Sequence, residues 1–186
     1  MARSKDRIVE EYLVASARLG DRAAASKLVA LRGPRLLAHA TRLIGNREDA
    51  RDIVQDAWIE ILRGLGQLQD DRAFPAWSTR IVTRRVARVI ADKVKHRDLA
   101  ATEGAGATWT DSDGPTAVDA RAVRKAIAAL PRDQAATIAL FYLEDMSVAE
   151  VAHALDVPAG TIKTRLMHAR TKLSQALKGG TDDETG

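Results

Sequence analysis

Apolar residues between positions 50 and 65 recur at the spacing of an α-helix, and this pattern limits the possible folds more than any other feature of the sequence. Steps of three and four residues place these side chains on one face of a helix. The set is Ala50, Ile53, Val54, Ala57, Trp58, Ile61, Leu62 and Leu65. Because such a helix must bury its apolar face, we expect other helices to pack around it.

Weaker helical patterns lie on both sides of this segment. A first helix is predicted to end at Gly20, and Asp21 can cap a second one that reaches "RGPR". Pro34 suits the first turn of a third helix, and Pro75 the start of a long helix. The predicted inward residues of the first helix are Ile8, Tyr12 and Leu19. Those of the long helix are Trp77, Ile81, Val82, Val86, Val89, Ile90 and Val94.

The composition changes sharply between residues 98 and 118, where lysine and arginine are absent and glycine, alanine, threonine and acids dominate. We interpret this segment as a flexible acidic linker between an N-terminal domain, residues 1–97, and a C-terminal domain, residues 119–178. Residues 179–186 are predicted to form a disordered tail. With 46% apolar but only 4% aromatic residues, the chain is predicted to be all-α, with two small helical domains.

The C-terminal domain is predicted to contain four helices, the last two of which form a helix-turn-helix unit. Ser147 and Glu150 have the S-x-x-E spacing of a capping box, which marks the start of one helix. The sequence "DVP" ends that helix, and Pro158 suits the first turn of the next. In such units the second helix lies in the major groove of DNA.

The surface of this second helix supports a DNA-binding interpretation. No acidic residue occurs from Thr161 to Lys178, although several basic residues do. Neutralising phosphates with such a surface releases counterions and favours binding to a duplex. An ordinary solvated helix face is the alternative. The candidate DNA-binding residues are Thr161, Lys163, Thr164, Arg165, Met167, His168 and Arg170.

The N-terminal domain carries charges of both signs, separated by position. Arg80, Arg84 and Arg88 recur every four residues on the long helix, with Arg85 beside them. The preceding helix carries Asp49, Asp52, Asp56 and Glu60 opposite its apolar face, with Gln55 near the edge. These acids could form a solvated surface, a docking site for a basic partner, or a metal site. A single straight helix cannot surround an ion, so we expect no metal there.

Several classes of function are disfavoured by the sequence. It has no cysteine, which excludes disulfides and thiol catalysis, and its four histidines are scattered. It contains no nucleophile elbow, P-loop or glycine-rich phosphate motif. We therefore expect no catalytic residues, no metal and no cofactor. The N-terminus lacks a continuous apolar segment, so we predict a cytoplasmic protein without membrane insertion.

Over nearly its whole length the chain resembles bacterial RNA polymerase sigma factors of the extracytoplasmic-function (ECF) group, within the sigma-70 family. The stretch "EDARDIVQDAWIEILRGL" is similar to the polymerase-docking helix of that family. "FPAWSTRIVTRRVARVIAD" resembles its helix for the −10 promoter element. "ALPRDQAATIALFYLEDMSVAEVAHALDVPAGTIKTRLMHARTKL" resembles its −35-binding domain.

The resemblance implies partners and residue roles. Core RNA polymerase would be bound through the clamp coiled coil of its largest subunit, by Asp49, Asp52, Gln55 and Asp56. The −10 element would be bound by Phe74, Arg80, Arg84, Arg85 and Arg88, with an unpaired base captured near the loop from residue 67. In the last helix, Lys163, Thr164 and Met167 would face the −35 bases, and Arg165, His168 and Arg170 the phosphates. An anti-sigma factor is a further implied partner.

Four departures from the family pattern are visible. Asp145 and Asp156 stand where the family usually has glycine. Aspartate enters the left-handed backbone region more readily than most residues, so both turns remain feasible at some energetic cost. Arg84 and Arg88 stand where asparagine and aspartate are usual, which affects the preference for −10 bases. The competing hypotheses are a stand-alone helix-turn-helix regulator and a sigma-like decoy that binds regulatory proteins.

Overall fold

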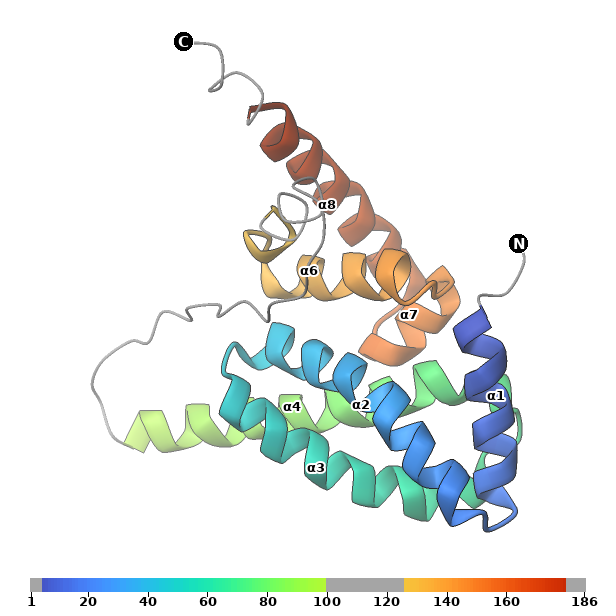
Figure 1. The fold of residues 1–186 in the computed structure, drawn as a ribbon. Coiled ribbons are helices and arrows are strands. Elements are labelled where there is room, and N and C mark those ends of the chain that lie inside the picture. Colours follow the sequence, from blue (N-terminus) through green and yellow to red (C-terminus); the bar gives the residue numbers. More distant parts are fainter. Residues whose placement is uncertain (1–4, 100–125, 180–186) are drawn as a thin grey trace. The chain divides into compact units, whose positions relative to one another are not determined.

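The computed structural model describes residues 5–99 and 126–179, and in these ranges every regular element is helical (Figure 1). The chain divides into two compact units, one around α1 to α4 and one around α6 to α8. The all-α prediction is therefore confirmed. Of the predicted linker, residues 100–118 lie outside the described residues, and so do residues 180–186 of the predicted tail. Residues 98 and 99, predicted to belong to the linker, and residue 179, predicted to belong to the tail, are instead the last residues of helices.

The first unit is a bundle of α-helices with two short 3₁₀ turns. Its elements are α1 (Lys5–Arg18), α2 (Arg22–Ile44), α3 (Arg47–Gly64), η1 (Leu65–Gln67), η2 (Asp71–Ala73) and α4 (Phe74–Leu99). The predicted cap is present at α2, where the Asp21 carboxylate accepts hydrogen bonds from the N–H groups of Ala23 at 2.8 Å and Ala24 at 3.1 Å. Gly45, with φ of 79°, closes α2 in the left-handed conformation.

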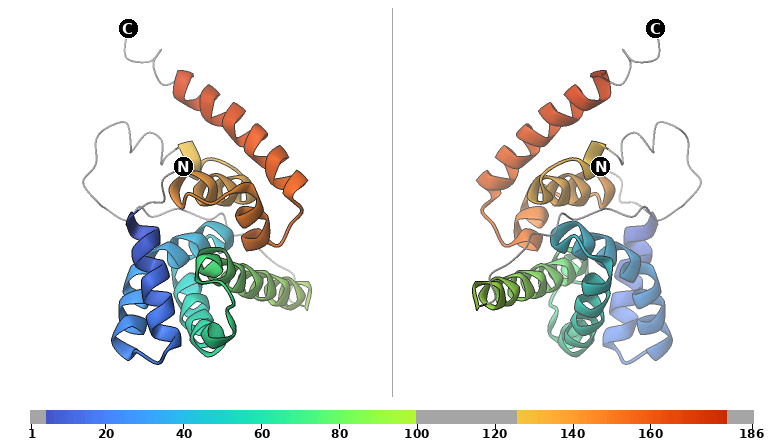
Figure 2. Two further views of the ribbon diagram at one scale, coloured as in Figure 1. Left: turned by 90° about the vertical axis from the view of Figure 1, so that its right-hand side faces the viewer. Right: turned by 90° about the vertical axis from the view of Figure 1, so that its left-hand side faces the viewer.

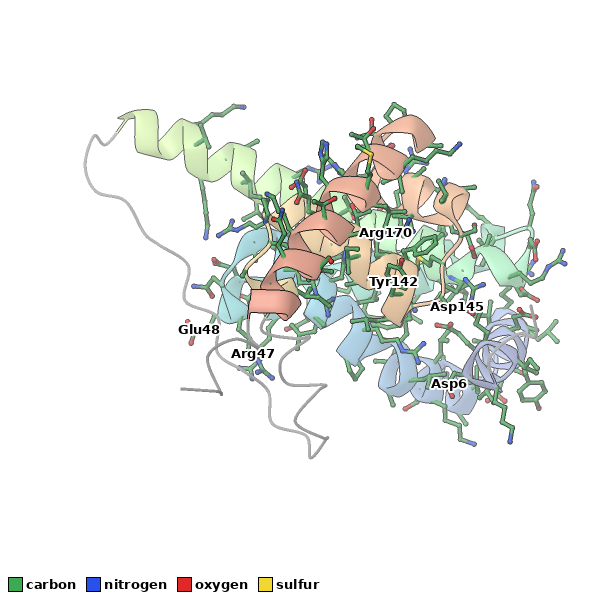
Figure 3. The ribbon with its side chains drawn as sticks, turned by 90° about the horizontal axis from the view of Figure 1, so that it is seen from above. Asp6, Arg47, Glu48, Tyr142, Asp145 and Arg170 are labelled. Atoms are coloured by element: carbon green, nitrogen blue, oxygen red, sulfur yellow. The ribbon has the colours of Figure 1, made fainter. Side chains whose placement is uncertain are left out.

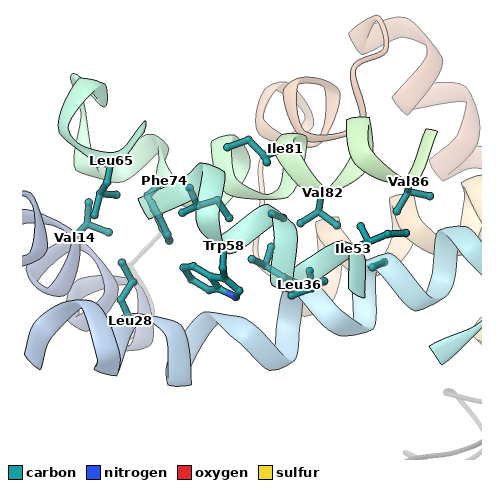
Figure 4. Close-up of a cluster of buried hydrophobic side chains, with 14 of the residues drawn as sticks. Val14, Leu28, Leu36, Ile53, Trp58, Leu65, Phe74, Ile81, Val82 and Val86 are labelled. Carbon is teal, nitrogen blue, oxygen red and sulfur yellow. The ribbon is translucent and has the colours of Figure 1, made fainter. Parts of the chain in front are cut away.

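The core of this unit contains apolar residues from all four α-helices (Figure 4). Leu28 and Leu36 of α2, Ile61 of α3 and Phe74 of α4 are fully buried. The predicted inward face of α3 is confirmed except at Leu62, which is 43% exposed. Ile61 and Leu65 already fill the inward side at this end of α3, which leaves Leu62 at the edge.

The predicted break at Pro34 is wrong, because α2 continues through it from Arg22 to Ile44. Proline removes only one hydrogen bond, the one to the carbonyl of Ala30 four residues earlier. Leu28 and Leu36, on either side of the proline, are both fully buried on the same helix. Continuing the helix keeps this buried face in register, which offsets the lost hydrogen bond. The unit therefore has four α-helices where five were predicted.

The predicted inward face of α1 is also wrong. Tyr12 is 70% exposed and Leu19 is 91% exposed, and Ile8 is exposed as well. The buried residues of α1 are Glu10, Leu13 and Val14. The sequence pattern is misleading because a carboxylate occupies a core position, where it pairs with the equally buried Arg32.

A glycine at the end of α3 allows α4 to pack closely against that helix. A Cβ atom on Gly64, the last residue of α3, would lie 3.1 Å from the Trp77 ring, so glycine lets the two helices approach closely.

The C-terminal part of α4 extends beyond the other helices of its unit (Figures 1 and 2). Ile90 and Val94, which were predicted to face inward, lie on this extension and are 39% and 49% exposed.

The second unit contains α6 (Arg132–Ile138), the π-helical turn η3 (Ala139–Leu143), most of α7 (Val148–Leu155) and α8 (Ala159–Gly179). The predicted second helix of this domain corresponds to α6 together with η3. Residues before α6 also contribute to the core, where Ala126, Ile127 and Leu130 are buried. From α8, Ile162, Leu166 and Ala169 are buried at helical spacing.

Candidate functional site

The acidic face of α3 begins at a well-defined helix start. Asn46 caps the helix, and its side-chain oxygen accepts hydrogen bonds from the N–H groups of Glu48 at 2.8 Å and Asp49 at 3.2 Å. Asp52, Gln55 and Asp56 are exposed, and Asp49 is half-buried. Because the apolar face of α3 is buried in the core, these polar side chains lie on its outer side.

Two cations of α4 pair with this acidic face. Lys93 Nζ lies 2.6 Å from Asp49 Oδ2. Arg85 Nη2 lies 2.9 Å from Glu60 Oε2, and its Nη1 lies 3.5 Å from Asp56 Oδ2. Within the part of the chain that the structure describes, neither Asp52 nor Gln55 has an ion pair or a side-chain hydrogen bond. Asp52 is therefore the acid of this face that is most available to a partner.

The arginines predicted for the −10 element do not share one environment. Arg84 and Arg88 are exposed one turn apart on α4, and Arg80, one turn earlier, is half-buried. Arg85 instead points toward α3. Phe74 has no exposed surface and packs against Trp77, with ring centroids 6.1 Å apart. The structure thus places Phe74 in the core of the first unit.

The helix-turn-helix unit has the predicted local geometry. The Ser147 N–H donates to Glu150 Oε2 at 2.7 Å, and the Glu150 N–H donates to Ser147 Oγ at 3.2 Å, which is a reciprocal capping box. Asp145 and Asp156 adopt φ values of 50° and 57°, so aspartate takes the left-handed conformation at both turns. These turns bracket α7 and set the start of α8.

The candidate residues of α8 separate into two groups. Lys163, Thr164, Met167 and His168 are exposed, and Thr161 is half-buried. Arg165 Nε lies 3.1 Å from Asp133 Oδ2 of α6. Arg170 Nε donates to the Tyr142 hydroxyl at 2.9 Å, and its guanidinium lies 5.9 Å from the centre of the Phe141 ring (Figure 3). The two arginines thus have partners within their own unit, whereas the exposed group is available to a ligand.

Comparison with protein families matches both units. A family model described as Sigma-70 region 2 matches residues 28–96, and one described as Sigma-70, region 4 matches residues 120–173. The ECF RNA polymerase sigma factor SigM of Mycobacterium tuberculosis is 32% identical over 167 residues, which cover 89% of this chain and 83% of SigM. This chain belongs to the ECF group of the sigma-70 family. Its function is that of a sigma factor in promoter-directed transcription initiation.

Other comparisons agree with this assignment. The ECF sigma factor SigW of Bacillus subtilis is 28% identical, with 86% of this chain and 91% of SigW covered. The sigma factor RpoE, solved in complex with the anti-sigma factor NepR from Bartonella quintana, has a TM-score of 0.70 at 22% identity, with 82% of this sigma factor and 96% of that chain covered. CnrH, solved in complex with the cytosolic domain of CnrY, has a TM-score of 0.59 at 25% identity, with 92% of this chain and 98% of the CnrH chain covered.

A buried polar cluster that the sequence did not reveal holds the first turns of α4 in this sigma factor. Arg32 of α2 donates to the Pro75 carbonyl at 3.1 Å and to Thr79 Oγ1 at 2.9 Å. Its Nε lies 3.7 Å from Glu10 Oε1 of α1, and both side chains are almost fully buried. Three helices are therefore joined where α4 begins. The available sequence signal was an arginine on the same helix face as Leu28 and Leu36.

His39 lies in the same interface and stays neutral in the folded protein. Its Nε2 lies 2.9 Å from Thr83 Oγ1 of α4. Burial, reinforced by the charges of Arg42 and Arg32, lowers the pKa of His39 from 6.5 to about 3.

We expect His39 to make folding stability fall as pH drops from 6.5 toward 3. Below pH 6.5 the unfolded chain binds a proton at His39 that the folded chain excludes, so unfolding is favoured. Between pH 7 and pH 5 this should remove about 2 kcal/mol. Urea denaturation of wild type and His39→Gln at both pH values measures the difference. His168→Gln, at an exposed position, is the control, and an equal pH-dependent loss in wild type and His39→Gln would contradict the prediction.

In the described ranges, no helix has the combination of length and apolar character needed to span a membrane. Among residues 5–99 and 126–179, no group of three or more histidine, aspartate or glutamate side chains is placed to hold a metal ion.

Proposed function

We propose that this sigma factor binds core RNA polymerase through α3 and recognises promoters through α4 and α8. The observation that carries the proposal is the separation of charge. Exposed carboxylates lie on α3, whereas α8 presents no acid between Thr161 and Lys178. A protein with both surfaces can bind a basic protein site and a DNA duplex at the same time. In this proposal it acts in the cytoplasm and has no catalytic activity of its own.

The polymerase site is centred on Asp52, with Gln55 and Asp56 beside it. These residues match the docking helix of the family, whose partner is the clamp coiled coil of the largest subunit. Asp49 contributes less in this proposal, because Lys93 lies 2.6 Å away and neutralises it. The availability of Asp52 and Gln55 supports their position at the centre of the site.

The −10 site is formed by Arg80, Arg84 and Arg88 on α4. Their four-residue spacing gives a basic stripe that can follow a DNA backbone or contact an unpaired base. Phe74 is left out because it is buried in the core. Arg85 is also left out, because it pairs with Glu60 of α3.

The −35 site is formed by exposed residues of the first three turns of α8. Lys163, Thr164 and Met167 face the bases in this proposal, and His168 lies nearer the phosphates. A recognition helix reads DNA with the residues near its N-terminus. Arg165 and Arg170 then act chiefly within the domain, because Asp133 and Tyr142 already engage them.

The domain limits belong to the same proposal. Residues 1–97 would form the polymerase and −10 domain, residues 98–118 the linker, and residues 119–178 the −35 domain. The matches to region 2 and region 4 support this division. An anti-sigma factor is a further proposed partner, since the structurally similar sigma factor RpoE was solved in complex with the anti-sigma factor NepR.

The −35 assignment predicts a specific loss in a Lys163→Ala variant. If Lys163 contacts a base edge, the variant should lose about 1–3 kcal/mol of binding to a cognate −35 duplex and little on a scrambled duplex. Fluorescence anisotropy on both duplexes measures this, with the cognate sequence taken from a promoter found by transcription with core enzyme.

The matched control is Lys172→Ala. Lys172 is exposed on the same helix, nine residues or about 13 Å farther along it. The Lys172→Ala variant should lose little affinity for either duplex. Equal losses on cognate and scrambled duplexes for Lys163→Ala would instead identify a phosphate contact.

A further inference from the structure

Arg85 of α4 lies between two acids of α3 that differ in how strongly they hold it. Glu60 Oε2 is 3.0 Å from its Nε and 2.9 Å from its Nη2, so this carboxylate binds two guanidinium nitrogens. Asp56 Oδ2 is 3.5 Å from Nη1 and makes one contact at the limit of hydrogen-bond distance. The pairing with Glu60 is therefore the stronger of the two.

Both acids are open to a partner, whereas the arginine between them is more enclosed. The side chains of Asp56 and Glu60 are 67% and 53% exposed, and that of Arg85 is 26% exposed. A partner can reach the Asp56 carboxylate, but Arg85 already places a positive charge beside it. Any basic side chain of a partner that binds Asp56 must compete with this charge.

We propose that Arg85 is an internal competitor for the polymerase cation at Asp56, and that Glu60 is the positioning residue that draws Arg85 away. This inference rests on the proposed docking role of α3. With Glu60 present, Arg85 has a better partner and releases Asp56. Without Glu60, Asp56 is the remaining acid beside Arg85, and the docking site loses negative charge where the polymerase needs it.

The mechanism predicts that, of the two residues of this ion pair, only Glu60 supports binding to core polymerase. Glu60→Gln should weaken binding to core polymerase about two- to fivefold, the range expected for exposed ion pairs. Arg85→Gln should leave the affinity unchanged or raise it by a similar factor, because Asp56 loses its competitor. A pair that serves only to hold α3 against α4 would instead give losses in both variants.

The double variant separates an indirect role of Glu60 from a direct one. In the Arg85→Gln background, Glu60→Gln should have no further effect on core binding, because no cation remains for Glu60 to hold. A persistent loss would show that Glu60 contacts the polymerase itself, and it would overturn the inference.

Arg88→Gln is the matched control for net charge. Arg88 is exposed on the same helix and its removal changes the charge equally. If Arg88→Gln raises the affinity as much as Arg85→Gln does, long-range charge explains the effect and the inference is overturned.

The experiment measures dissociation constants of the full chain for purified core polymerase at low salt, by fluorescence of a labelled sigma factor. Urea denaturation of each variant verifies folding. Wild type and Asp52→Arg are measured alongside. Absence of wild-type binding would refute the proposed function itself, whereas normal wild-type binding with equal effects of Glu60→Gln and Arg85→Gln would refute only this inference.

Discussion

Replacing Asp52 with arginine is expected to lower the affinity for core RNA polymerase by at least about 100-fold. Asp52 is exposed on the outer side of α3, where in the described part of the chain no cation pairs with it. A basic docking surface would therefore meet an arginine at the centre of the acidic face. Placing like charges together across an interface costs several kcal/mol.

Asp52 is a cleaner test than Asp56. Reversing the charge of Asp56 would also break its contact with Arg85, so two effects would be mixed. Asp52→Arg should unfold at the same urea concentration as wild type, because exposed substitutions change stability little.

Asp92→Arg is the control for this experiment. Asp92 is exposed on α4 and is not one of the acids of α3, and its replacement changes net charge by the same amount. It should bind core polymerase nearly as wild type does. Normal core binding by Asp52→Arg, or an equal loss in Asp92→Arg, would remove α3 as the docking site.

The second large effect is expected at Arg32. An Arg32→Met variant removes the buried cation that lies 3.7 Å from the Glu10 carboxylate, and this should cost about 3–5 kcal/mol of unfolding free energy. Urea denaturation followed by circular dichroism measures the loss. Because Arg32 joins α2 to the start of α4, the backbone N–H groups of α4 should lose protection from hydrogen exchange in the same variant.

A double variant tests whether the stability loss of Arg32→Met comes from the Glu10 carboxylate that remains buried. Glu10→Leu combined with Arg32→Met replaces both ions with apolar groups, and this should recover more than half of the lost stability. The Pro75 carbonyl remains satisfied, because Thr79 Oγ1 donates to it at 2.7 Å. A double variant as unstable as Arg32→Met would contradict the buried ion-pair explanation.

Local patterns in the sequence predicted much of the fold. The apolar repeat of α3, the Asp21 cap and the Ser147–Glu150 capping box are all found in the structure. Each depends on residues close together in the chain, so propensity and spacing suffice to predict it.

The errors arose where distant contacts decide the structure. The inward face of α1 was wrong because a buried Glu10 needs Arg32, which is 22 positions away. The break at Pro34 was wrong because packing on both sides of it maintains a single helix. The role of Phe74 at the −10 element stays a prediction from resemblance, and its burial in the core could not be predicted because it depends on how α4 packs against the other helices.

The candidate surfaces show the same limit. Spacing placed the acids of α3 and the basic residues of α8 on exposed faces, and the structure agrees for Asp52 and Lys163. Sequence could not predict which charges would be paired internally, because those pairs form between helices. Arg85 with Glu60 and Arg165 with Asp133 are examples.

Transcription with purified core polymerase tests the central claim most directly. Wild-type protein added to core enzyme, with a library of genomic fragments as template, is predicted to produce initiation at a distinct set of promoters sharing −10 and −35 motifs. Asp52→Arg should produce none of these transcripts. Promoter-specific binding of the chain to DNA without core enzyme, together with no initiation from any fragment, would contradict the account and favour a stand-alone regulator.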